Sequence, residues 1–267
     1  ANGPLSEYRL LLRTSGEQLC FHSDGHITGP GEAGGFLSRL DDWYQKEKTK
    51  PPGVFEWPFC GGWFLYLGYE LAAEIEPVVD FPASEDGFPV AFANRCPAVI
   101  YSRPDQPGVL HLVAESAALL DEMRNELESL RPVAGQTQTA LTRLKADPPS
   151  SFKQAVERIH EYILDGDVFQ VNLSRAWNGE FSKRPDAGTL YRSLRKSNPA
   201  PFAGMVRWKD FTLMSSSPER LVNTRERVVQ SRPIAGTRPR GANHDADLAL
   251  SRELLAHPKE RAEHIML

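Results

Sequence analysis

The ten residues RPIAGTRPRG, numbered 232–241, contain three arginines, two prolines and two glycines. Pro233 and Pro239 restrict the backbone and remove two hydrogen-bond donors, while Gly236 and Gly241 let backbone N–H groups approach a ligand closely. The arginines can each bind a carboxylate through two hydrogen bonds. Because no phosphate-binding P-loop motif is present, the stretch favours a small anion over a nucleotide. A tight basic turn at the surface is the alternative.

The composition is typical of a globular protein that buries a substantial core, as one large domain or two small ones in 267 residues. The 31 Lys and Arg are outnumbered by 35 Asp and Glu, which argues against a nucleic-acid partner. No signal peptide and no run of about 18 apolar residues is present, which predicts a cytoplasmic protein with no membrane span. The 3 cysteines are far apart, so we expect reduced thiols.

Hydrophobic periodicity and turn residues predict an α+β protein. The polar segment 131–149 is predicted to be a linker between an N-terminal part, 1–130, and a second region, 150–267. On the strand predicted at 168–177, Gln170 and Asn172 share a face that is either a polar pocket wall or solvent-exposed. We expect further strands at 8–14, 18–22, 63–69, 98–103, 109–114, 202–208, 211–216 and 227–231, and helices at 33–48, 116–130, 150–165 (capped by Ser150 or Ser151), 187–196, 245–256 and 258–267.

Three serines, 215–217, end a predicted strand and are followed by Pro218 and Glu219. This arrangement places the Glu219 carboxylate at the mouth of a strand. A carboxylate that is partly removed from water there can act as a general acid or base. The alternative is a surface glutamate paired with Arg220.

The last predicted helix brings His257, Glu260, Glu263 and His264 near one face. A zinc-dependent hydrolase is one interpretation, although the spacing misses the known zinc motifs. A hard ion such as Mg²⁺ held by Glu263 fits better, because Mg²⁺ takes few protein ligands. A solvated helix face is the other alternative.

The order of five motifs along the chain is more specific than any one of them. The motifs are GG and GYE within 61–70, GDVFQVNLS at 166–174, SPER at 217–220, RPIAGTRPRG at 232–241 and RAE at 261–263. In this order they resemble the chorismate-utilising enzymes, which comprise anthranilate synthase component I, aminodeoxychorismate synthase component I, and the isochorismate and salicylate synthases. The resemblance implies a large α/β sandwich with the site between two sheets. It also implies a partial chain, in which 150–267 is the first half of the catalytic region.

The resemblance also implies roles for individual residues. Glu219 corresponds to the general acid/base that helps the C4 hydroxyl of chorismate to leave, and Glu263 to a ligand of the Mg²⁺ that holds the C1 carboxylate. The backbone of Gly236 and Thr237 corresponds to part of the substrate cradle. Ala235 stands where one group of aminodeoxychorismate synthases has a nucleophilic lysine. Covalent catalysis at this position is therefore excluded, and ammonia is expected to attack C2 directly.

Two further positions indicate the subclass. Gln170 stands where isochorismate and salicylate synthases have a lysine that activates water, so the chain resembles an ammonia-using member with a glutaminase (glutamine amidotransferase) partner. Residues 198–204, NPAPFAG, depart from the NPSPYM that is typical of the tryptophan feedback site of anthranilate synthases. They favour an aminodeoxychorismate synthase that uses chorismate and ammonia. Anthranilate synthase component I is the alternative, and an inactive binding or regulatory chain is the alternative from another class.

Overall fold

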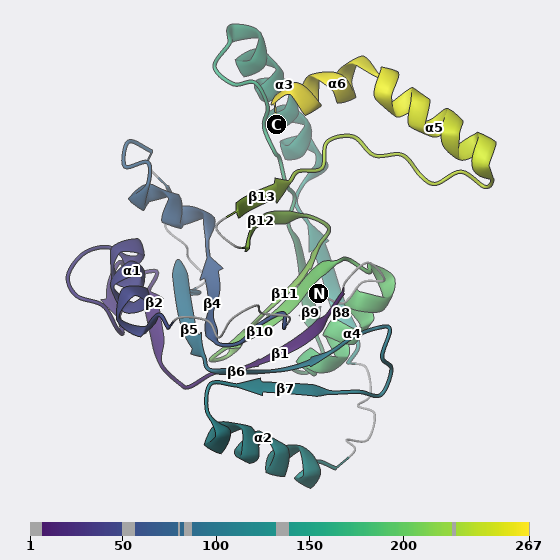
Figure 1. The fold of residues 1–267 in the computed structure, drawn as a ribbon. Helices are drawn as coiled ribbons and strands as arrows, with labels where there is room; N and C mark the ends of the chain where they lie inside the picture. Colours follow the sequence, from purple (N-terminus) through teal and green to yellow (C-terminus); the bar gives the residue numbers. More distant parts are fainter. Residues whose placement is uncertain are drawn as a thin grey trace. The chain divides into compact units, whose positions relative to one another are not determined.

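The computed structural model describes residues 7–49, 57–79, 81–82, 87–131, 139–225 and 228–266. The chain divides into two compact units, whose elements are drawn in Figure 1. Unit 1 contains Ala1–Arg131 and Asn198–Leu267, and unit 2 contains Pro132–Ser197. Helices and sheets occur in both units, which confirms the α+β class. The unit boundaries differ from the expected division, since the last 70 or so residues group with the N-terminal part.

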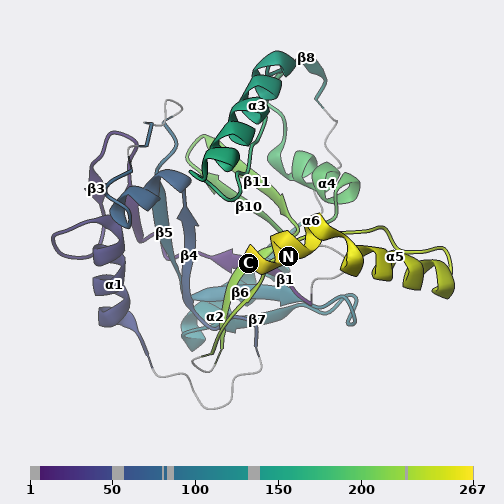
Figure 2. The ribbon, with the colours of Figure 1, turned by 90° about the horizontal axis from the view of Figure 1, so that it is seen from above.

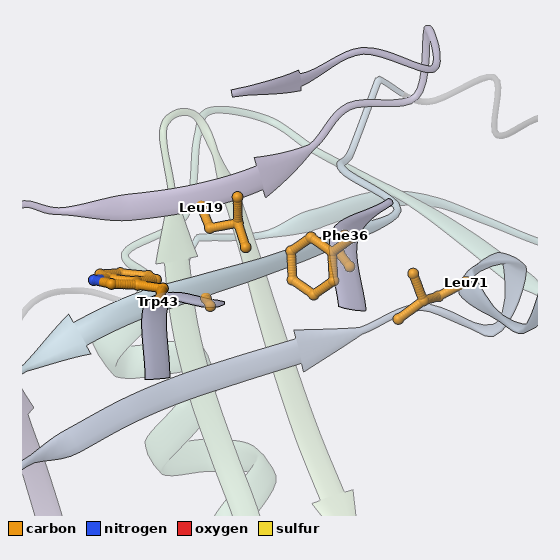
Figure 3. Packing of buried hydrophobic residues seen from close by; sticks show 6 residues of the cluster. Leu19, Phe36, Trp43 and Leu71 are labelled. Atoms are coloured by element: carbon orange, nitrogen blue, oxygen red, sulfur yellow. The ribbon is translucent and has the colours of Figure 1, made fainter. Parts of the chain in front are cut away.

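A four-stranded antiparallel sheet with the order β3-β2-β5-β4 forms the centre of unit 1. Its central strand β5 is almost fully buried. The helix α1 packs on this sheet, and Figure 3 shows the side chains of Leu19, Phe36, Trp43 and Leu71 gathered in the resulting core. The elements are β2 (Gln18–Phe21), β3 (Ile27–Thr28), α1 (Phe36–Glu47), β4 (Gly62–Leu67) and β5 (Ala91–Cys96).

The first turn of α1 obtains its capping group from a distant segment. Gly35 at the N-cap has no side chain to offer, so the carboxylate of Glu74 accepts hydrogen bonds from the backbone N–H groups of Phe36 (2.6 Å) and Leu37 (3.0 Å). Glu74 ends the short 3-10 helix η1 (Tyr69–Glu74). A negative charge at this position satisfies orphan donors and complements the helix dipole.

A second antiparallel sheet, with the order β1-β6-β7, carries the helix α2 beside β7. The hairpin expected at 98–103 and 109–114 is confirmed. Its elements are β1 (Arg9–Arg13), β6 (Ala98–Ser102), β7 (His111–Ala114) and α2 (Ala117–Ser129). The strands β1 and β2 are neighbours in sequence, but each pairs within a different sheet.

The C-terminal part of unit 1 consists of two hairpins followed by two helices, α5 and α6, which Figure 2 shows in succession. Trp208 joins the first hairpin to the four-stranded sheet. Its ring packs with Cys20 and Phe92, and its Nε1 donates to Oε1 of Gln18 at 3.3 Å. The elements are β10 (Phe202–Trp208), β11 (Phe211–Ser217), β12 (Arg220–Arg225), β13 (Val228–Arg232), α5 (His244–Ala256) and α6 (Pro258–Met266).

Unit 2 pairs β8 (Leu141–Ala146) with β9 (Trp177–Phe181) and contains α3 (Pro149–Asp165) and α4 (Ala187–Ser197). The expected linker thus contains a strand, and its residues 132–138 lie outside the described residues. The predicted serine cap of α3 is wrong, because the helix already begins at Pro149, a residue suited to a first turn. Gly166, at φ 83°, ends the helix as expected. Among the described residues, none of the helices is both long and apolar enough to cross a lipid bilayer.

The strand predicted at 168–177 is also wrong. Residues 168–176 have no regular structure, and β9 begins only at Trp177. The alternation of polar and apolar side chains is suited to a strand, but a strand is stable only when its backbone groups are paired. No strand of the described residues pairs with this segment.

Candidate functional site

The carboxylate of Glu219 is joined to the start of the loop that follows β13. Its Oε1 accepts a hydrogen bond from the backbone N–H of Ile234 at 3.1 Å. The backbone around Glu219 is itself fixed by Ser217, whose Oγ accepts from the N–H of Glu219 (3.3 Å) and donates to its carbonyl (3.1 Å). This turn explains why a strand ending in serine, followed by Pro218, presents the next side chain to the loop. Glu219 is exposed and forms no ion pair with Arg220, so the alternative of a simple surface pair is wrong.

The middle of the same loop contacts α6 through Gly236. Glu260 lies so close to the Gly236 backbone that a β-carbon at 236 would overlap its carboxylate. Arg238 holds this carboxylate: its Nη1 lies 3.2 Å from Oε1 of Glu260, and its Nε lies 2.9 Å from Oε1 of Glu253 on α5. The side chain of Glu260 is only 13% exposed. The loop and both helices therefore form one charged network.

The end of the loop is fastened to the first turn of α5. Arg240 donates two hydrogen bonds of 2.7 Å to the carboxylate of Asp247, and the backbone N–H of Gly241 donates a third of 2.8 Å. The hydrogen bonds from Arg240, helped by the one from Gly241, hold the pKa of the Asp247 carboxyl below its ordinary value. Asn243 caps α5 by accepting from the N–H of Ala246 at 2.9 Å.

These contacts correct one expectation about the loop arginines. Arg238 and Arg240 were expected to be available for an external anion, but both guanidinium groups bind carboxylates of the chain's own helices. They shape the loop and do not offer free charge to a ligand. Of the loop's three arginines, Arg232 alone has no such partner among the described residues.

The structure brings some of the predicted site residues together and separates others. Glu219, Gly236 and Thr237 lie on or against one loop of unit 1, with Ala235 half-buried between them. Gln170 is exposed and belongs to the irregular segment of unit 2. Sequence reasoning missed the contact of Glu260 with Gly236, because the two residues are far apart in the chain and neither residue type indicates the other.

The metal hypothesis can be tested against the donor set on α6. Glu260 and Glu263 are three residues apart, a spacing that places two side chains on the same helix face. Carboxylates are the ligands that Mg²⁺ prefers, and one or two of them are enough. The Glu260 carboxylate is already bound by Arg238, so Glu263 is the residue of this helix that fits Mg²⁺. In the described ranges, no group of three or more His, Cys, Asp or Glu side chains is arranged to hold a metal ion.

Comparison with known protein families shows the class to which the chain belongs. Residues 13–267 match the model of the family described as chorismate binding enzyme. The chain belongs to this family.

Relatives with assigned names fall into two groups. The aminodeoxychorismate synthase component 1 of Bacillus subtilis is 47% identical over 260 residues, which cover 92% of this chain and 53% of the relative. The anthranilate synthase component 1 of Cereibacter sphaeroides is 36% identical over 230 residues, which cover 79% of this chain and 45% of the relative. The chain thus spans about half the length of the curated relatives it matches.

The fold is similar to a solved structure over its whole length. The anthranilate synthase component I of Streptococcus pneumoniae superposes with a TM-score of 0.78, covering 100% of this chain and 61% of that one. The sequences are 24% identical in this comparison, so the likeness establishes the fold alone. The expected chorismate-utilising fold is confirmed.

Proposed function

We propose that this protein aminates chorismate with ammonia to give 4-amino-4-deoxychorismate, the precursor of p-aminobenzoate in folate biosynthesis. The observation that carries the proposal is the 47% identity to an aminodeoxychorismate synthase over 92% of the chain, against 36% over 79% for an anthranilate synthase. The NPAPFAG sequence at 198–204 supports the same branch. A glutaminase subunit is the proposed source of ammonia, and the cytoplasm is the proposed location.

Glu219 is the proposed general acid that protonates the departing C4 hydroxyl. Its hydrogen bond from Ile234 fixes one carboxylate oxygen, and its exposed position leaves the other open to a substrate. The backbone of Gly236 and Thr237 is the proposed cradle. Glu263 is the proposed holder of Mg²⁺, which would supply positive charge for a substrate carboxylate.

The residue at position 235 bears on whether the product carries its nitrogen at C2 or at C4 of chorismate. Attack of ammonia at C2, with the double bond shifting and water leaving from C4, places nitrogen on C2. That is the isomer from which loss of pyruvate gives anthranilate. A 4-amino product needs nitrogen at C4, by direct displacement there or through a temporary nucleophile at C2. The methyl group of Ala235 cannot be that nucleophile, so the direct C2 attack expected from the resemblance favours anthranilate synthase as the second candidate.

The test is to incubate the full-length protein with chorismate, Mg²⁺ and ammonium and to follow fluorescence before and after adding aminodeoxychorismate lyase. A p-aminobenzoate signal that appears only after the lyase supports the proposal. Anthranilate fluorescence without lyase overturns it in favour of the second candidate. No signal in either arm overturns both and supports an inactive chain.

A further inference from the structure

Two arginines face each other across the β12–β13 hairpin. Arg220 is the register partner of Arg232 in this antiparallel pair, and the pairing becomes irregular between Arg220 and Asn223. Directly opposite residues of an antiparallel pair project from the same face of the sheet. Like charges in that arrangement repel, so the hairpin carries an electrostatic cost unless an anion lies between them.

The guanidinium of Arg220 is the more constrained of the two. Its Nε and Nη2 atoms are buried, and neither has a hydrogen-bond partner among the described residues. An arginine side chain stays protonated in proteins, so Arg220 cannot relieve this cost by becoming neutral. A buried donor of a charged group is costly when left unpaired. Arg220 therefore carries a positive charge that no acidic group of the described residues neutralises.

The neighbouring acidic residue does not provide the missing charge. Glu219 uses its Oε1 for the N–H of Ile234 and forms no ion pair with either arginine. The acidic side chains of α5 and α6 that contact the loop are bound by Arg238 and Arg240. Arg238 and Arg240 are thus neutralised by carboxylates of the described residues, whereas Arg220 and Arg232 are not.

We propose that Arg220 and Arg232 form a binding site for the carboxylate of a small acid. Nε and Nη2 lie on one edge of the planar guanidinium, and this edge matches the two oxygens of a carboxylate in a bidentate pair. Arg232 adds a second positive charge from the opposite strand. Arg220 directly follows Glu219 in the sequence, and Arg232 lies two residues before Ile234. An acid bound by the two arginines would therefore lie beside the loop that Glu219 contacts. Its assignment to chorismate, which carries two carboxylates, rests on the proposed function.

The experiment observes the Nε–H signals of arginine by ¹H–¹⁵N NMR while the protein is titrated with chorismate or with succinate. The signal that disappears in Arg220→Met is assigned to Arg220. We expect both acids to shift it in a saturable way, with a dissociation constant at least tenfold larger in Arg232→Met. Arg207→Met is the matched control and should leave the dissociation constant unchanged. Arg207 is an exposed arginine of β10 that forms no ion pair with any described residue.

Each outcome decides one part of the proposal. The proposal is overturned if neither acid shifts the Arg220 signal, or if Arg207→Met weakens binding as much as Arg232→Met. A shift with succinate but not with chorismate keeps a carboxylate site and overturns its assignment to the substrate. If both acids bind but the synthase assay shows no product, the site stands and the proposed function fails.

Discussion

Glu260 of α6 lies against Gly236 of the loop between β13 and α5, so that its carboxylate occupies the space where a side chain at 236 would begin. Arg238, two residues along the same loop, binds that carboxylate and a second one from Glu253. A side chain at 236 would therefore have to displace the Glu260 carboxylate from its contact with Arg238. This relationship joins the proposed substrate cradle to the helix that carries the proposed metal ligand, Glu263.

Replacing Gly236 by alanine should disrupt this junction. The new β-carbon would overlap the Glu260 carboxylate, which could move only by weakening its pair with Arg238. We expect a loss of about 1 to 3 kcal/mol in the free energy of unfolding, the range of overpacking changes, and at least tenfold lower synthase activity. Urea denaturation and the chorismate assay measure the two effects. Gly204→Ala is the control, because nothing lies within 4 Å of its β-carbon position.

Arg95 should be the most important charged residue of the N-terminal sheets. It is 9% exposed, binds Glu47 at 2.6 Å and Glu115 at 2.7 Å, and lies over the Trp63 ring at 4.8 Å. Arg95→Met leaves both carboxylates without a cationic partner, although Glu47 keeps the hydrogen bond from Nε1 of Trp43. We expect the free energy of unfolding to fall by about 2 to 3 kcal/mol, less than for a fully buried pair because the carboxylates are partly exposed. Urea midpoints measure this. Arg103→Met breaks the exposed ion pair with Asp105 and should leave the urea midpoint unchanged. Equal shifts of the midpoint in both variants would contradict the prediction.

The Arg240–Asp247 pair should make stability depend on pH in the acid range. Because the hydrogen bonds from Arg240 lower the folded-state pKa of Asp247, its contribution is complete above the unfolded value of about 3.9 and is lost as pH falls through the folded pKa. Urea midpoints between about pH 7 and 2.5 should therefore fall less steeply in Asp247→Asn than in the wild type. Arg240→Gln should have the same effect, and the double variant should add little; additive effects would show that the pair is not coupled.

Cys20 should resist alkylation in the folded protein. Burial raises the pKa of its thiol to about 11, so only about one molecule in 1,000 carries the reactive thiolate at pH 8. Cys60 is half-buried and should react faster. Mass spectrometry of the protein after iodoacetamide treatment at pH 8 gives the rate for each thiol. Faster labelling of Cys20 than of Cys60 would contradict the packing of Cys20 against Phe92 and Trp208.

Local patterns were sufficient for most helices and for the hairpins β6–β7 and β10–β11. The periodic stripe at 33–48 gave α1, and the runs at 202–208 and 211–216 gave β10 and β11 within one residue. The strand β5 was missed because Asn94 and Arg95 interrupt its apolar run. Their partners come from distant segments: Gln18 for Asn94, and Glu47 and Glu115 for Arg95. These polar side chains can be buried in the strand only because the tertiary structure supplies those partners.

The contacts within the candidate site could not be predicted from the sequence. The motif order indicated Glu219 and the loop 232–241, and the structure joins them through Ile234. The partners of Arg238 lie 15 and 22 residues away, and nothing local distinguishes them from other glutamates. The opposition of Arg220 and Arg232 needed the hairpin register, which the sequence did not indicate because β12 was not expected.

Glu219→Gln is the sharpest test of the proposed chemistry. Glutamine keeps the carbonyl oxygen that accepts from Ile234 N–H, so the turn and the loop should stay as they are. It removes the proton that the departing hydroxyl needs, and loss of a general acid costs typically about 10² to 10⁴ in rate. We expect product formation to fall by that factor while the urea midpoint stays within error. Glu180→Gln on β9 of unit 2, an exposed glutamate with one surface ion pair, is the control and should keep full activity. Wild-type activity in Glu219→Gln would assign the proton transfer to another group and leave Glu219 with a structural role at the Ile234 turn.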